Sequence, residues 1–166
     1  MAVIQAWRLV SVARADTAFD GEGSYRYGNR WNHPGTRVVY LASTTSLAAL
    51  EVLVHAESYD ELPEYRAFPV EFDESLVAEL PELPPDWQQS PAPQSTKRLG
   101  SRWAQEGKSA LLRVPSAVVT WEHNYVLNVL HPDYAKVHIG EQRVFIPDSV
   151  SSSPNGDELT RPKGVL

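Results

Sequence analysis

The sequence predicts an α+β fold, with a compact mixed or antiparallel β-sheet core and a few helices. Segments of strand character outnumber helical ones, and the two do not alternate regularly, as they would in a doubly wound parallel sheet. The length of 166 residues fits one domain with a sizeable buried core. We expect residues 1–147 to form that domain. Residues 148–166, with the composition of turns and disordered segments, should form a tail.

Five segments predict strands because β-branched and aromatic residues are frequent in them. They are residues 1–10, 37–43, 65–73, 110–114 and 137–146. Pro69 has no N–H group for a ladder, so it should place its strand at a sheet edge or at a bulge. Gly140 and Glu141 predict that the last segment folds as a hairpin.

The first predicted helix contains an unusual carboxylate. Thr44 or Thr45 can cap this helix, which should run over residues 46–57 without a proline. Its apolar side chains cover nearly the whole circumference, which predicts a buried helix. Glu51 lies among them, with His55 at the i+4 position. Because an unpaired buried carboxylate is costly, Glu51 should either form a structural pair with an arginine or a histidine, or face a polar functional cavity.

The second predicted helix follows a proline-rich stretch. Residues 81–94 predict a loop. Ser95 or Thr96 should cap the helix, and the helix should end near Glu106 because Gly107 favours a left-handed C-terminal cap.

Composition excludes several functions. The chain has no cysteine, and its five histidines lack metal-site spacing, so we expect neither thiolate chemistry nor a metal centre. The formal charge of −6 disfavours direct binding of nucleic acid. Without a long apolar run or a signal peptide, the protein is expected to be cytoplasmic, with no membrane span. The five tryptophans and seven tyrosines indicate an aromatic core, a site for a flat ligand, or both. We expect Trp7, Trp103 and Tyr125 in the core.

The segment Gly21–Gly35, GEGSYRYGNRWNHPG, combines glycines, cations and aromatic rings. Glycines allow a ligand to approach the backbone closely, while Arg30 supplies a charge for phosphate. Tyr27 and Trp31 supply flat faces for a base or a nicotinamide ring. The phosphate-loop and Rossmann glycine patterns are absent, and the alternative is a surface loop held by its own aromatic residues.

Four other polar residues stand out. Ser116 follows a predicted strand without the G-x-S-x-G pattern of a nucleophile, so a hydroxyl that binds a ligand or a carboxylate is better supported; a simple turn residue is the alternative. Asn124 and Asn128 are four residues apart. Arg8, central in an apolar strand, needs an anionic partner such as Glu51 or a ligand, unless it faces water at a sheet edge.

Together these segments resemble the RES-domain family, the toxin halves of Xre–RES toxin–antitoxin pairs. The resemblance runs through YRYGNRWNHPGTRVVYLASTTSLAALEVLVH (Tyr25–His55) and LLRVPSAVVTWEHNYVLNVLHPDY (Leu111–Tyr134), within a region from about Trp7 to Ile146. Asn29 stands where the family usually has a second glycine. The family is named for an arginine, a glutamate and a serine, which by position are Arg8 (or Arg30), Glu51 and Ser116.

The resemblance implies an ADP-ribosyltransferase-like fold and NAD⁺ as substrate, with no cofactor or metal. In this reading Glu51 stabilises the oxocarbenium-like ribose as nicotinamide leaves, and Arg8 and Arg30 neutralise the pyrophosphate. Ser116 and Asn124 would orient the ribose or Glu51. The candidates for stacking on nicotinamide or positioning the ribose are Tyr27, Trp31 and Tyr40.

The partner that the resemblance implies is an Xre-type helix-turn-helix antitoxin, which would bind DNA, block the active site and form a hetero-oligomer with this chain. Three functions stay open: a toxin that consumes NAD⁺ by hydrolysis or phosphorolysis, a mono-ADP-ribosyltransferase that modifies a protein, and a non-enzymatic co-repressor. Transferases commonly place a second carboxylate or a glutamine just before the catalytic glutamate. Ala48–Leu50 precede Glu51 here, which favours a small acceptor.

Overall fold

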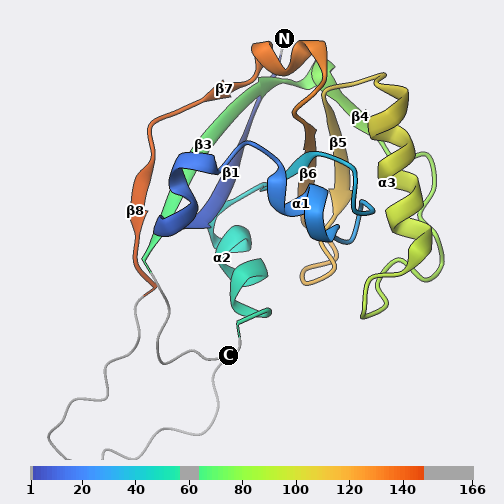
Figure 1. The fold of residues 1–166 in the computed structure, drawn as a ribbon, viewed down its shortest axis with the longest axis horizontal. Coiled ribbons are helices and arrows are strands. Elements are labelled where there is room, and N and C mark those ends of the chain that lie inside the picture. Colours follow the sequence, from blue (N-terminus) through green and yellow to red (C-terminus); the bar gives the residue numbers. More distant parts are fainter. Residues whose placement is uncertain (1, 57–63, 148–166) are drawn as a thin grey trace, which may run out of the picture.

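An eight-stranded, mostly antiparallel sheet forms the centre of the computed structural model, which describes residues 2–56 and 64–147 (Figure 1). The strand order is β4-β5-β6-β2-β1-β3-β7, with β8 also paired to β3, and β4–β5 is the parallel pair. This arrangement confirms the predicted α+β class. The tail predicted at residues 148–166 lies outside the described residues.

The strands are β1 (Val3–Ser11), β2 (Val38–Ala42), β3 (Tyr65–Asp73), β4 (Val77–Glu79), β5 (Leu111–Pro115), β6 (His123–Asn128), β7 (His138–Ile139) and β8 (Arg143–Phe145). The α-helices are α1 (Glu22–Tyr27), α2 (Thr45–Leu53) and α3 (Gln94–Glu106), and short 3₁₀ turns occupy Val12–Thr17, Glu74–Leu76 and Pro132–Lys136. Within the described residues, no helix has the length and apolar composition that crossing a membrane requires.

The two longer helices cover the same face of the sheet. Side chains alternate along a strand, so Val38 and Ala42 of β2 point to one face. Ala42 packs with Leu47 of α2, and Val38 packs with Trp103 of α3. Leu41 points to the other face, into a core covered by 3₁₀ turns and connecting segments. In Figure 1 α2 lies below the middle strands and α3 lies beside β4 and β5.

Helix α2 is shorter and more exposed than the sequence predicts. Thr44 is the N-cap, and its side chain accepts a hydrogen bond from Leu47 N at 3.0 Å. The helix ends at Leu53. The prediction that it is buried all round is wrong, because Leu50 is 38% exposed and Val54 is 46% exposed. One side of α2 packs on the sheet and the other borders solvent.

Helix α3 begins earlier than predicted. Pro93 is its N-cap and provides no side-chain hydrogen bond. The predicted caps lie inside the helix, where Ser95 donates to Asp86 and Thr96 donates to the Pro93 carbonyl. Its predicted end is confirmed, since Gly107 has the left-handed conformation, φ 60°, that favours glycine.

The final strand segment is not a hairpin. β7 pairs with β3 at Val70 and β8 pairs with β3 at Tyr65, both antiparallel, so the chain keeps one direction past Gly140. The interruption falls at Pro69, whose carbonyl accepts from Gly140 N at 2.8 Å. The carbonyl and the nitrogen of one strand residue point to the same side of the strand, so the nitrogen of Pro69 also faces the gap between β7 and β8. No strand residue there needs a backbone N–H donor, and a proline is therefore tolerated.

Candidate active site

The end of the β5–β6 hairpin holds the carboxylate of Glu51. Ser116 follows β5 directly and Asn124 lies in β6, opposite Val114. Ser116 Oγ donates to Glu51 Oε1 at 2.6 Å, and Asn124 Nδ2 donates to the same oxygen at 2.8 Å. Two neutral donors, rather than a cation, therefore stabilise this half-buried carboxylate of α2.

All the hydrogen-bonding capacity of the Ser116 hydroxyl is used. Besides donating to Glu51, Oγ accepts from the backbone N–H groups of Val118 and Val119, each at 3.1 Å. A serine hydroxyl has one proton and two acceptor lone pairs, so the two N–H groups direct its proton to Glu51. Ser116 is fully buried. This geometry suits a residue that orients Glu51 and does not suit a nucleophile.

Asn124 has its amide group fixed toward Glu51. Its Oδ1 is buried and meets no donor in the described residues. An unsatisfied buried acceptor costs about 1–3 kcal/mol. If the amide of Asn124 were rotated by about 180°, its Oδ1 would face the Glu51 carboxylate, and two acceptor oxygens would oppose each other. Both donors bind Oε1, and no donor of the described chain reaches Oε2, which leaves that oxygen available to a ligand.

Two half-buried arginines stand out because they lack a carboxylate partner among the described residues. Arg8 and Arg30 donate from their side chains only to backbone carbonyls. Carbonyls fix a guanidinium without cancelling its charge, so both arginines can still bind an anion. The other half-buried arginines pair with glutamates, in the pairs Arg37–Glu22, Arg66–Glu64 and Arg113–Glu79.

Arg8 bridges β1 and β2 where their ladder has ended. The two strands pair at Trp7, and beyond it Arg8 Nη1 donates to the Tyr40 carbonyl at 3.3 Å while Nε donates to the Ala18 carbonyl at 3.1 Å. Burial lowers the pKa of Arg8 to about 10, an effect that Arg14 reinforces. The predicted pairing of Arg8 with Glu51 is not formed.

Arg30 is held by the proline-rich segment. Its Nη1 donates to the carbonyls of Trp87 at 2.7 Å and Gln89 at 2.9 Å. Burial lowers the pKa of Arg30, and the negative charge of Glu51 opposes that shift. Arg30 therefore lies within the electrostatic reach of Glu51.

Tyr40 and Asn32 fix the loop that carries Arg30. The Tyr40 hydroxyl donates to Asn32 Oδ1 at 2.7 Å and accepts from Trp31 N at 3.1 Å. Burial raises the pKa of Tyr40, which keeps this hydroxyl protonated. Asn32 Nδ2 donates to three loop carbonyls, those of Ser24, His33 and Thr36. The hydroxyl of Tyr40 thus serves the loop, and only its ring could contact a ligand.

The predicted ligand contact of Trp31 is wrong. Trp31 is 2% exposed and packs in the core with Trp103. Its carbonyl lies so close to α3 that a Cβ on Gly100 would be 1.8 Å from it. Tyr27, by contrast, is 76% exposed at the end of α1, and its predicted role is neither supported nor opposed by a contact. Trp103 and Tyr125 are buried as predicted.

Sequence reasoning missed the two backbone carbonyls that hold Arg30 and the side chain of Asn32. The carbonyls of Trp87 and Gln89 belong to the backbone, and every residue type has one. The sequence therefore cannot indicate that these two residues hold Arg30. Asn32 did have a signal, as a polar residue directly after a tryptophan in a glycine-rich segment. His55 lies beyond the end of α2 and is exposed, and it does not pair with Glu51 in the structure.

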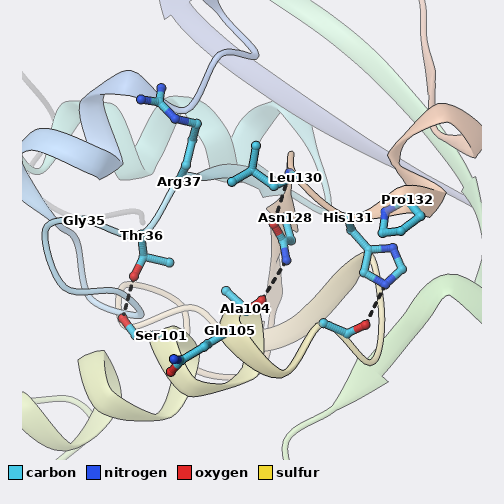
Figure 2. Close-up of a pocket in the computed structure, with 11 residues that line it drawn as sticks. Gly35, Thr36, Arg37, Ser101, Ala104, Gln105, Asn128, Leu130, His131 and Pro132 are labelled. Atoms are coloured by element: carbon cyan, nitrogen blue, oxygen red, sulfur yellow. Dashed lines mark hydrogen bonds between the residues drawn. The ribbon is translucent and has the colours of Figure 1, made fainter.

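A hollow of about 510 Å³ lies elsewhere, between α3, the segment before β2 and the turn after β6 (Figure 2). Its polar groups bind one another: Thr36 with Ser101 at 3.1 Å, Asn128 with the Ala104 carbonyl at 3.0 Å, and His131 with the Gly107 carbonyl at 2.9 Å. None of its lining residues is a carboxylate or one of the residues predicted to catalyse the reaction or to contact NAD⁺. Its hydrogen bonds join α3 to the sheet, so we place the chemistry at Glu51.

Comparison with known proteins identifies the family of this chain. The RES domain matches residues 5–148. The chain belongs to the RES-domain family. Two relatives, each named "Toxin Res", are 36% identical: one from Yersinia enterocolitica over 130 residues (77% of this chain, 86% of that protein), and one from Pseudomonas putida over 148 residues (86% and 96%). The resemblance seen in the sequence is thereby confirmed.

Two further comparisons bear on activity and fold. A Sphingobium sp. protein named "Prs ADP-ribosylating toxin" is 39% identical over 151 residues, covering 86% of this RES domain protein and 92% of the relative. The crystal structure of the M. tuberculosis MbcT–MbcA toxin–antitoxin complex contains a similar fold, with a TM-score of 0.68 and 19% identity. The match covers 88% of this chain and 86% of that one.

Proposed function

We propose that this RES-domain protein is the toxin of a toxin–antitoxin pair and that it breaks the nicotinamide–ribose bond of NAD⁺. The observation that carries the proposal is the pair of hydrogen bonds from Ser116 and Asn124 to one oxygen of Glu51. They orient a carboxylate whose other oxygen is available to a substrate. The names of the relatives support the toxin role.

A fixed carboxylate matches the demands of this reaction. When the bond between C1′ of the ribose and the nicotinamide nitrogen breaks, the bonding electrons leave with neutral nicotinamide and the ribose becomes oxocarbenium-like. Glu51 Oε2 would stabilise that positive charge. Water then attacks C1′ and releases a proton, giving ADP-ribose; inorganic phosphate would give ADP-ribose 1″-phosphate. Because the leaving group is neutral, no strong general acid is required.

The two half-buried arginines that meet no carboxylate within residues 2–56 and 64–147 suit the diphosphate of NAD⁺. Arg8 and Arg30 keep an uncancelled charge, and a guanidinium can give an oxyanion two parallel hydrogen bonds. The aromatic contact with nicotinamide remains a prediction for Tyr27 and for the ring of Tyr40. In this proposal NAD⁺ is the substrate, and the residues of the site require no separate cofactor or metal.

A second candidate is transfer of ADP-ribose to a protein. The name of the Sphingobium relative favours it. The two reactions share bond cleavage and differ in the acceptor. The residues before Glu51 are apolar, Ala48–Leu50, and provide no second acceptor-activating group, which favours the small acceptor.

The proposed partner is an antitoxin of the Xre type with its own helix-turn-helix. The solved complex of the similar fold is a toxin–antitoxin complex, which supports a partner of this general kind. The acidic charge of the chain, −6, is consistent with a toxin that leaves DNA binding to that partner.

The test is to incubate purified protein with NAD⁺ and follow released nicotinamide, with and without phosphate. Release that needs phosphate shows phosphorolysis, and release without it shows hydrolysis. With NAD⁺ labelled in the adenylate part, label on a protein band would favour the transferase. No nicotinamide release under any of these conditions would contradict the proposal.

A further inference from the structure

The proline-rich segment between β4 and α3 is folded against Arg30. Trp87 N donates to the Pro84 carbonyl at 3.1 Å, and Gln89 N donates to the Asp86 carbonyl at 2.9 Å, which gives two overlapping turns. Asp86 Oδ1 accepts from Ser95 Oγ at 2.5 Å. These bonds join the segment to the first turn of α3.

The side chain of Trp87 anchors this segment to the core. It is half-buried and packs against the cluster that includes Trp103 of α3 and Leu112 of β5. The backbone of the same residue accepts from Arg30. The tryptophan thus connects the core directly to a charged group of the candidate site.

The hydrogen bonds of Arg30 fix the direction of its guanidinium. Nη1 has two protons, and the carbonyls of Trp87 and Gln89 accept both. Because the group is planar, fixing Nη1 also fixes the plane in which Nε and Nη2 lie. Neither of these nitrogens has an acceptor among the described residues, so their N–H groups are available to an anion.

The loop that carries Arg30 is fixed from its other side as well. Asn32 and Tyr40 bind it to β2 through the 2.7 Å hydrogen bond. Ser101 Oγ of α3 accepts from His33 N at 2.9 Å. Arg30 is therefore held between a rigid loop and the turns of residues 84–89, while its charge remains uncancelled.

We infer that residues 84–89 form a wall of the substrate site and that Trp87 is a positioning residue, which sets the affinity for the diphosphate of the substrate by fixing Arg30. The identity of the anion rests on the proposed function. The wall and the positioning role rest on the contacts of Trp87 and Arg30 alone. This assigns a role to a tryptophan and a loop that the sequence left unexplained.

The test is a double-mutant cycle on anion binding, with inorganic pyrophosphate as the probe in calorimetry. Trp87→Ala should weaken binding about tenfold in the wild-type background and less than about twofold in an Arg30→Ala background, because the effect passes through Arg30. Trp87→Phe, which keeps an anchoring ring, should restore most of the affinity. Leu83→Ala, an exposed change in the same segment, is the matched control and should leave affinity unchanged.

If Trp87→Ala lowers the affinity for pyrophosphate equally in the wild-type and Arg30→Ala backgrounds, the inference is overturned. It is also overturned if the wild-type protein does not bind pyrophosphate. Thermal unfolding of each variant shows that the proteins compared are folded. NAD⁺ consumption is measured separately. Coupling without consumption would contradict the proposed function alone, and consumption without coupling would contradict this inference alone.

Discussion

Ser116 and Glu51, 65 residues apart in the chain, are joined by a 2.6 Å hydrogen bond in which the serine is the donor. Two backbone N–H groups of the β5–β6 loop fix the direction of that proton. The orientation of the carboxylate is therefore built into the turn of a hairpin, and it does not depend on a counter-ion.

We expect Ser116→Ala to lower kcat for NAD⁺ cleavage by about 10- to 100-fold, with a smaller effect on KM. A hydrogen bond to a charged group contributes about 1.5–3 kcal/mol, and each 1.36 kcal/mol corresponds to a factor of ten in rate. Steady-state nicotinamide release measures the effect. Complete loss together with a covalent ADP-ribosyl adduct on the wild-type serine would contradict an orienting role.

The matched control for this variant is Ser109→Ala. The Ser109 hydroxyl accepts from Trp103 Nε1 at 2.8 Å and donates to the Leu111 carbonyl at 3.0 Å, away from Glu51. We expect Ser109→Ala to lose about as much stability as Ser116→Ala, while its kcat stays near that of the wild type. Equal loss of kcat in both variants would show that the effect of Ser116→Ala is general destabilisation.

Binding of a diphosphate should weaken at high pH because of Arg8. Burial lowers the pKa of Arg8 to about 10, so its charge is complete at neutral pH and is lost as the pH rises through about 10. A bound anion favours the protonated form. Affinity is therefore independent of this group well below pH 10 and falls above it, by up to tenfold per pH unit.

Calorimetric affinity for ADP-ribose between about pH 7 and about pH 11 tests this dependence. Arg8→Gln should bind ADP-ribose more weakly than wild type at neutral pH. Its affinity should also fall less steeply above about pH 10, because the titrating guanidinium is gone. Identical declines in the two proteins would assign the pH dependence to other groups and would contradict the role of Arg8.

Gly100→Ala, on the side of α3 that faces Trp31, should disturb the loop that carries Arg30. An added Cβ would lie 1.8 Å from the Trp31 carbonyl, a contact that backbone must move to relieve. We expect a loss of stability of about 1–3 kcal/mol or more and a raised KM for NAD⁺. Urea unfolding and steady-state kinetics measure the two effects. Gly23→Ala is the control, because a Cβ there meets nothing within 4 Å; similar stability of both variants would contradict the close packing.

The sequence predicted most of the sheet and the principal members of the site. Strand β3 matches its predicted range of 65–73, because alternation and composition agree there. Glu51 was identifiable since a carboxylate in an apolar helix requires a partner, and Ser116 and Asn124 were identifiable from their motif. What could not be predicted is that both donate to one oxygen, because that depends on the register of β5 and β6.

The errors have physical causes of the same kind. A glycine after a strand predicts a turn, yet Gly140 allows close approach to Pro69 and the chain continues straight. Trp31 lies in a segment whose composition is typical of a ligand site, but its side chain is buried by packing against α3. Glu51 was one of the partners expected for Arg8, whereas backbone carbonyls, which a sequence does not reveal, hold that guanidinium. Tertiary packing decides each of these cases.

The rate of nicotinamide release from NAD⁺ by wild type and by Glu51→Gln, under identical conditions, tests most directly whether Glu51 is the catalytic carboxylate. The substitution keeps the shape of the side chain and removes its negative charge, with Glu106→Gln, an exposed change on α3, as the control. We predict a loss of at least about 100-fold for Glu51→Gln, typical for removal of a group that stabilises transition-state charge, and no loss for the control. Equal rates in wild type and Glu51→Gln would contradict the assignment of the site to Glu51.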